Sequence, residues 1–324
     1  MFGFIVRRIL ALFCVLLIAV SLTFCLLRLA PGSPFALNEK QSTAENVAKQ
    51  EVLYDLDRGI PSQCARYLGI MKNNRGYYSG LLFSNDPAAS FPDLHRCLKY
   101  KDRTVNELIA DTLPVSAIIG GLSLLIASVA GIWLGSIAAL RKHTWVDSAT
   151  MLSAMLAVSI PTFVTGPLLV LVFSLWFGWL PVGGWGGLAS LVLPSITLAG
   201  PFIAYIARLT RTSMLEVLAQ DFVRTAYAKG LNERKVIYKH VLKVAVLPVV
   251  SFLGPLAAGL LTGSLVIERV FNLPGIGDFF VNSVLNRDVF LCCGSVAVYC
   301  TLLVVMNLIV DIAYQAIDPR IRLE

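Results

Sequence analysis

Residues 115–139 read VSAIIGGLSLLIASVAGIWLGSIAA, an apolar stretch without a charged side chain. As an α-helix, which rises about 1.5 Å per residue, a stretch of this length reaches across the hydrocarbon core of a bilayer, which is about 30 Å thick. Apolar residues make up 56% of the whole chain, and a soluble domain does not usually hold such long uncharged runs. The stretch therefore predicts a membrane-spanning helix.

Other apolar runs have a similar length. The six candidate spans together are 9–27, 115–139, 149–177, 191–209, 244–267 and 290–314. The third, fourth and fifth contain prolines, which a helix bundle tolerates when neighbouring helices satisfy the freed carbonyl groups. The sequence thus predicts an all-α polytopic membrane protein with six transmembrane helices, which need not be straight.

The first run follows Arg7 and Arg8, as the apolar region of a secretory signal peptide would. The residues after it, RLAPGSPF, offer no clear small-residue cleavage site. We therefore favour a retained first helix over the alternative, a cleaved signal.

Lysine and arginine predict the orientation, because cytoplasmic loops are enriched in them. The segment 178–190 between two spans has no charge, which suits the outer side. The inner side then carries Arg7, Arg8, Arg141, Lys142, the basic residues of 208–243, Arg320 and Arg322. Both termini are therefore expected in the cytoplasm. The net charge of +7 is attributed to this topology and not to nucleic-acid binding.

The expected organisation has four parts. They are a cytoplasmic N-terminus with the first helix in 1–30, an outer segment between helices 1 and 2 in 31–111, a core of five spans in 112–314, and a cytoplasmic tail in 315–324. The outer segment holds ten basic and ten acidic residues, and its stretch STAENVAKQEVLYDLD has a helical pattern. It also contains Cys64 and Cys97, for which a disulfide and two unpaired thiols both remain open.

The sequence shows no catalytic or metal-binding pattern. His95, His143 and His240 are its only histidines, and no HExxH, GxSxG or paired-carboxylate motif accompanies them. The phosphate-binding motif GxxxxGK[ST] is absent as well. We predict no enzyme, no metal and no cofactor in this chain. If the protein moves a solute uphill, another protein must supply the energy.

The stretch 221–243, DFVRTAYAKGLNERKVIYKHVLK, is a basic island between two apolar blocks. We expect an amphipathic helix over 213–228, a left-handed Gly230 that ends it, and a second short helix capped by Asn232. The coupling loop as a whole is expected in 210–243.

Two interpretations of this island remain. In the first, Leu231, Val236, Ile237 and Tyr238 insert into a groove of a partner protein while the charged side chains form a rim. In the second, the basic segment only holds anionic lipid and sets the topology.

Motifs along the whole chain decide between these interpretations. They are RRIL, RLAPGSP, SIPTF, LPVGG, RTAYAKG followed by LNERKVIYKHVLKVAV and Leu-Pro, VIERVFNLPGIG, and NLIVDIAYQAIDPRIR. This pattern resembles the B-type permease subunits of the oligopeptide and dipeptide ABC importers, a family whose nickel-transporting branch shares the same loop. In the cytoplasmic EAA loop of these permeases a small-residue triplet is followed, three residues later, by glycine. Here the triplet is Arg224, Thr225 and Ala226, and the glycine is Gly230.

The resemblance implies a pathway subunit of an ATP-driven peptide importer that couples ATPase motion to alternating access. It also implies that the chain lies in the cytoplasmic (inner) membrane of a bacterium. The partners it implies are a homologous C-type permease, two cytoplasmic ATPase subunits that hold ATP and Mg²⁺, an extracytoplasmic peptide-binding protein and membrane lipid, with no nucleic acid. The ATPase-coupling residues it implies are Arg224, Thr225, Ala226, Gly230, Leu231, Asn232, Val236 and Tyr238. The alternatives are import of nickel or another small solute, and a channel or carrier that works alone.

Polar residues near the ends of the last two spans have open roles. In VIERVFNLPGIGDFF, Glu268, Pro274, Gly275 and Gly277 belong either to an outer gate or receptor contact, or to a tight re-entrant turn that holds the bundle together. Asp311, near the inner end of the sixth span, is either a pathway residue or a helix-end residue that lies near water or pairs with an arginine.

Overall fold

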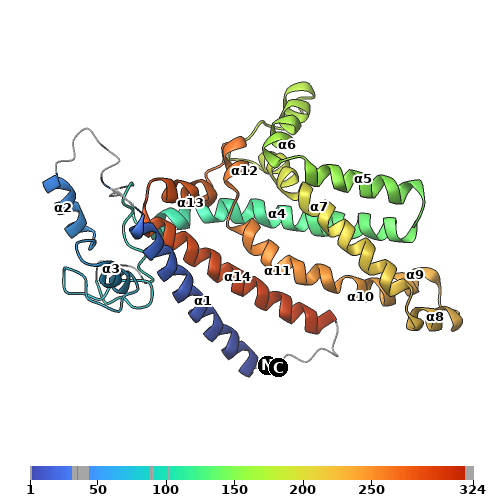
Figure 1. Ribbon diagram of the computed structural model, residues 1–324. Helices are drawn as coiled ribbons and strands as arrows, with labels where there is room; N and C mark the ends of the chain where they lie inside the picture. Colours follow the sequence, from blue (N-terminus) through green and yellow to red (C-terminus); the bar gives the residue numbers. More distant parts are fainter. Residues whose placement is uncertain are drawn as a thin grey trace. The chain divides into compact units, whose positions relative to one another are not determined.

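The computed structural model describes residues 2–30, 35, 44–87, 89, 91–100 and 103–317 (Figure 1). Across these residues the regular structure is helical. Two isolated β-bridges, Lys72 with Tyr78 and Arg96 with Thr104, are the only extended pairings in this part of the chain. The predicted all-α class is therefore confirmed.

Four helices are unbroken and apolar enough to cross a bilayer. They are α1 (Phe2–Leu29), α4 (Val105–Leu140), α7 (Leu188–Leu218) and α14 (Val289–Ile317). They contain the first, second, fourth and sixth predicted spans. A helix satisfies its backbone hydrogen bonds within the segment, which is what lipid requires.

The third predicted span, 149–177, is sharply bent. Helix α5 (Trp145–Ser159) meets α6 (Thr162–Leu169) and the π-helix η1 (Val170–Trp176) at 105°. The cause is Pro161, whose ring disfavours helical backbone in the residue before it. Ile160 is accordingly extended, with φ −88° and ψ 119°.

The fifth predicted span, 244–267, is divided among several helices. They are α10 (Leu242–Ala245), α11 (Leu247–Leu261) and α12 (Leu265–Val270). Two short helices, α9 (Glu233–Lys235) and η2 (Val236–Val241), run directly into α10. The helical run of α9 to α10 meets α11 at 48°. Gly263, with φ +87°, separates α11 from α12. The described residues thus hold four unbroken candidate spans, or six if each bent pair counts as one span.

Contacts divide the chain into two compact units. Unit 1 comprises Met1–Arg8, Val115–Pro274 and Leu302–Glu324, and unit 2 comprises Ile9–Pro114 and Gly275–Thr301. Helices α1, α4 and α14 contribute residues to both units.

Unit 2 contains the described part of the predicted outer segment. Its helices are α2 (Ala44–Leu53), which lies in the stretch predicted as helical, α3 (Ile60–Tyr67) and α13 (Ile276–Leu285). Tyr67 is buried at its centre, with ring centroids 5.7 Å from Phe24 and 5.8 Å from Phe290. These aromatic rings join the outer segment to the ends of α1 and α14.

Asp288 connects the outer segment with the start of α14. Its carboxylate accepts hydrogen bonds from the backbone N–H of Leu291 at 3.2 Å, Leu98 at 2.8 Å and Lys99 at 3.2 Å. Burial nevertheless raises the pKa of the Asp288 carboxyl. One side chain thus caps a helix and fixes a loop that is remote in sequence.

Cys64 and Cys97 are buried and free in unit 2. Burial raises the pKa of the Cys97 thiol to about 12. The thiol therefore stays protonated at neutral pH, and a protonated thiol is a weak nucleophile. Of the two possibilities that the sequence left open, the structure has the unpaired thiols.

Small residues bring the helices of unit 1 close together. A Cβ at Gly120 of α4 would overlap the backbone carbonyl of Leu260 in α11, and one at Gly135 would overlap that of Ala207 in α7. Close backbone approach of this kind is a main source of helix association in membranes. Helix α4 is thus held against both α7 and α11.

Gly120→Ala should destabilise unit 1, because the added methyl group must push α4 away from the backbone of α11. Overpacking of this kind costs about 1–3 kcal/mol. The neighbouring Gly121→Ala is the control, since its Cβ would lie at an ordinary 4.0 Å from Leu261 Cδ2. Thermal unfolding in one detergent measures both variants, and equal midpoints would contradict the close contact of α4 with α11.

Candidate functional site

The basic island folds into a helical segment at the end of α7, which we call the knob and define as residues 219–245 (Figure 1). The expected single helix over 213–228 is wrong, because α7 ends at Leu218 and α8 (Asp221–Ala228) starts anew. Gln220 between them is extended, with φ −79° and ψ 151°. The turn places α8 where it buries apolar side chains against the end of α7, which a straight helix would leave in water.

Gly230 ends α8 in the left-handed conformation that the sequence predicted, with φ +75°. Its N–H donates to the Tyr227 carbonyl at 2.9 Å, and the Leu231 N–H donates to the Ala226 carbonyl at 3.3 Å. These bonds satisfy carbonyl groups at the helix end, as glycine caps commonly do. A Cβ at Gly230 would meet nothing within 4 Å, so only the backbone conformation restricts this position.

Asn232 caps the second helix of the knob, as predicted. Its side chain accepts a hydrogen bond from the Arg234 N–H at 3.1 Å. Asparagine is among the preferred residues for this position, because its short side chain satisfies an N–H group at the helix start.

The knob has an apolar core of its own. This core joins residues of the knob to the ends of α4 and α7, and its buried members are Ala139, Met214, Val217, Val223, Ala226, Val236, Ile237, Val241 and Ala245. Val236 is fully buried and Ile237 is 8% exposed. This corrects the expectation that Val236 and Ile237 face a partner, since their side chains are used to hold the knob onto α7.

The outer face of the knob is aromatic and basic. Tyr238 is 71% exposed, Tyr227 44% and Phe222 40%. The exposed charged side chains of the knob are Asp221, Arg224, Lys229, Glu233, Arg234, Lys235, Lys239 and Lys243. Phe222 and Tyr227 are not among the predicted coupling residues, although both flank the buried positions Val223 and Ala226 on the surface of α8, where half-exposed side chains are expected.

The eight predicted coupling residues fall into different environments. Those exposed on the knob are Arg224, Thr225, Gly230, Asn232 and Tyr238, while Leu231 is half-buried, and Ala226 and Val236 are buried. The exposed residues can therefore contact a partner protein, whereas the buried side chains of Ala226 and Val236 cannot.

The predicted outer-gate residues do not form one exposed surface. Glu268 is buried and accepts a hydrogen bond from the Ser116 hydroxyl at 2.7 Å. Pro274 is exposed, whereas Gly275 and Gly277 are buried, and Gly275 precedes the first residue of α13. Glu268 thus lies inside unit 1, where it links α12 to α4.

Asp311 forms an ion pair with Arg8. Three residues further along α14, the Tyr314 hydroxyl donates to the Leu247 carbonyl at 2.7 Å. Of the two roles that the sequence left open for Asp311, the structure has the arginine partner, and these contacts hold the end of α14 to α1 and α11.

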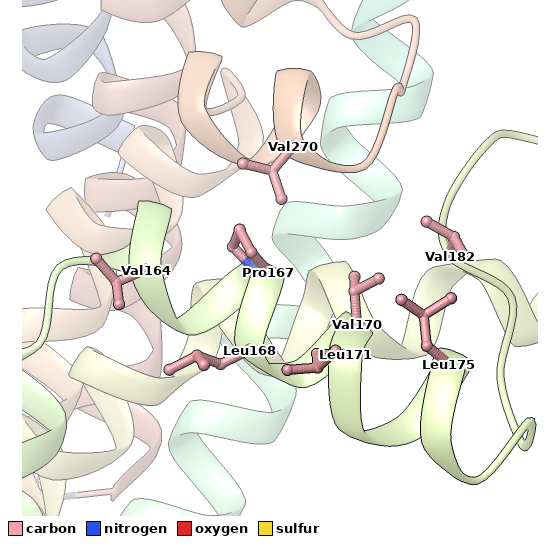
Figure 2. Close-up of a pocket in the computed structure, with 8 residues that line it drawn as sticks. All are labelled: Val164, Pro167, Leu168, Val170, Leu171, Leu175, Val182 and Val270. Carbon is pink, nitrogen blue, oxygen red and sulfur yellow. The ribbon is translucent and has the colours of Figure 1, made fainter.

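An open pocket of about 560 Å³ lies beside the bent third span. Figure 2 shows its lining from α6, η1, the following loop and α12, with the side chains Val164, Pro167, Leu168, Val170, Leu171, Leu175, Val182 and Val270. None of these side chains can form a hydrogen bond, so the lining side chains do not bind the charged ends of a peptide. Among the residues that the structure describes, no group of three or more His, Cys, Asp or Glu is arranged to hold a metal ion.

Comparison with known proteins places similar sequences along the whole chain. The family described as "Binding-protein-dependent transport system inner membrane component" matches residues 131–323, and the N-terminal membrane component of such systems matches residues 1–120. The oligopeptide transport system permease protein OppB of Salmonella typhimurium is 43% identical over 324 residues, which cover 99% of this chain and 100% of that protein. The dipeptide transport system permease protein DppB of Bacillus subtilis is 39% identical over 321 residues, which cover 99% of this chain and 98% of that protein. The crystal structure of an amino acid ABC transporter with histidines has 14% identity and a TM-score of 0.49, over 65% of this chain and 94% of that chain.

Val236→Ala should loosen the knob while leaving its outer face intact. Removing two buried methyl groups costs on the order of 2 kcal/mol, so the knob should open more often and trypsin should cleave it faster in inside-out vesicles. Tyr238→Ala is the control, because its side chain is 71% exposed and its removal should not change the cleavage rate. Equal cleavage of Val236→Ala and the unchanged protein would contradict the assignment of Val236 to the core.

Proposed function

This chain belongs to the family of binding-protein-dependent transport system inner membrane components, and within it to the permeases of oligopeptide and dipeptide ABC importers; from that membership we propose that it forms one half of the transmembrane pathway for imported peptides. The family consists of permease subunits that carry no catalytic activity of their own. The energy for uphill import must then come from ATPase subunits, which would hold the ATP and Mg²⁺.

The knob is the part of the chain that docks onto an ATPase. The observation that carries this proposal is the separation of its side chains into a buried apolar core and an outer face with exposed Tyr238, Tyr227 and Phe222. Exposed aromatic side chains within a charged rim are typical of protein contacts. A loop that served only to hold lipid headgroups would need its lysines and arginines, but no apolar core of its own.

The remaining partners follow from the family. A homologous C-type permease would complete the pathway, two ATPases would bind on the cytoplasmic side, and a binding protein would deliver peptide from outside. This multi-pass protein is homologous to bacterial inner-membrane permeases, and the distribution of lysine and arginine supports an orientation with both termini in the cytoplasm.

The outer face of the importer is assigned to unit 2. A polar pocket of about 670 Å³ in this unit is lined by side chains of both charge signs, among them Arg75, Asp86, Asp93 and Arg96. Such a mixed surface suits contact with the binding protein, because complementary charges steer and orient two proteins. Of the predicted outer-gate residues Glu268, Pro274, Gly275 and Gly277, only Pro274 is exposed, and the turn at Pro274 and Gly275 remains the proposed outer gate.

In the proposed mechanism the ATPases approach each other when they bind ATP and move the knob with them. Helix α7 leads directly into the knob and shares its core through Met214 and Val217. Movement of the knob would therefore tilt α7, and the helices packed on α7 would change between inward-open and outward-open arrangements.

Gly230→Asp should abolish peptide uptake without preventing membrane insertion. The left-handed conformation costs a residue with a side chain about 1 kcal/mol, and nothing within the chain lies in the way of a Cβ. A buried contact with the ATPase cannot solvate the added charge, so the ATPase should no longer copurify with the permease.

Lys235→Ala is the control for this variant, because Lys235 is an exposed rim charge and such charges contribute little to binding. Copurification of the ATPase and uptake of a labelled tripeptide measure both variants. Normal ATPase binding and uptake by Gly230→Asp would show that the knob only sets topology.

A further inference from the structure

Asp147 and Arg211 form a two-point ion pair between α5 and α7. Arg211 Nε lies 2.5 Å from Asp147 Oδ1, and Arg211 Nη2 lies 2.7 Å from Oδ2. The His143 N–H donates to the same Oδ2 at 3.1 Å, and Asp147 is 5% exposed. A paired arrangement of this kind fixes both the distance and the orientation of the two side chains.

The pair lies within one helical turn of the knob core. Arg211 is three residues before Met214, so the two side chains lie on the same face of α7, and Met214 is a fully buried member of the knob core. Asp147 is in the first turn of α5, directly after the loop that connects α4 to α5. A movement of the knob therefore reaches Arg211 within one helical turn.

The other end of α5 leads to the break at Ile160. Beyond this break the chain turns by 105° into α6 and η1. Helix α5 also packs along α7, but apolar contacts between helices allow small sliding movements. The ion pair is the contact between these two helices that resists both sliding and rotation.

We propose that Asp147 and Arg211 are positioning residues that pass the movement of the knob to the bent span formed by α5, α6 and η1. This inference rests on the proposed function of the knob as the ATPase contact. If the pair only stabilised the fold, its loss would reduce the amount of assembled importer. If the pair transmits movement, its loss lowers the ratio of peptide imported to ATP hydrolysed.

The test uses the complete importer in proteoliposomes, with its ATPases, partner permease and binding protein. The measured quantity is the ratio of labelled tripeptide imported to ATP hydrolysed. Asp147→Asn removes the charge, and Arg211→Lys keeps the charge but removes the two-point geometry. In each variant the ratio should fall by about five-fold or more, the lower end of the usual coupling between communicating sites. The matched controls are Glu216→Gln and Arg208→Lys, which alter exposed residues of α7 in the same way and should keep the ratio.

Two fluorescent reporters separate transmission from docking. A label on a cysteine at Gln220, which lies within the knob at the start of α8, should respond to ATP in Arg211→Lys as it does in the unchanged protein. A label at Met155, which is 65% exposed on α5, should lose its response in the same variant. Loss at Met155 with retention at Gln220 supports the proposal.

The proposal is overturned if Arg211→Lys leaves either the import ratio or the response of the label at Met155 unchanged. Arg211→Lys is the more conservative variant, and it gives the answer if the Asp147→Asn protein does not accumulate in the membrane. Failure of the proposed function gives a different result, because the label at Gln220 would then not respond to ATP even in the unchanged importer.

Discussion

The absence of water inside the bilayer is the constraint on which this structure depends. Each backbone N–H and C=O in the hydrocarbon region has to find its partner within the protein, so the apolar stretches fold as helices. Irregular backbone is then confined to places where the chain itself provides partners or where the chain leaves the membrane. The break at Ile160 and Pro161 and the turns of the knob are such places, and both have a part in the proposed function.

The same constraint explains how the helices hold together. Lipid tails are as apolar as leucine, so burial of apolar side chains gives little net force between helices in a membrane. Unit 1 instead uses close backbone contact at Gly120 and a small number of polar links, among them Ser116 with Glu268. Contacts of this kind occur at a few specific residues rather than along the whole helix. A helix that is joined to its neighbours at only a few points can move as one rigid body.

The sequence predicted the features that depend on local chemistry. The apolar stretches marked the spans, glycine marked the left-handed residue at position 230, and asparagine marked the helix cap at position 232. It did not predict the division of the helix over 213–228 or the burial of Val236, because an amphipathic pattern does not say whether its apolar face meets the chain itself or another protein. The Asp147–Arg211 ion pair could not be predicted from the sequence for a related reason. Its two residues are 64 positions apart, and the local sequence around each residue does not indicate its partner.

The central claim is that the outer face of the knob contacts an ATPase, and a photo-crosslinking amino acid at Tyr238 tests it most directly. This side chain is 71% exposed and lies among the charged residues of the knob. Illumination of membranes that contain the assembled importer should produce one covalent adduct between this chain and an ATPase subunit. Adducts with lipid alone, in membranes from which the ATPase still copurifies with this chain, would contradict the account.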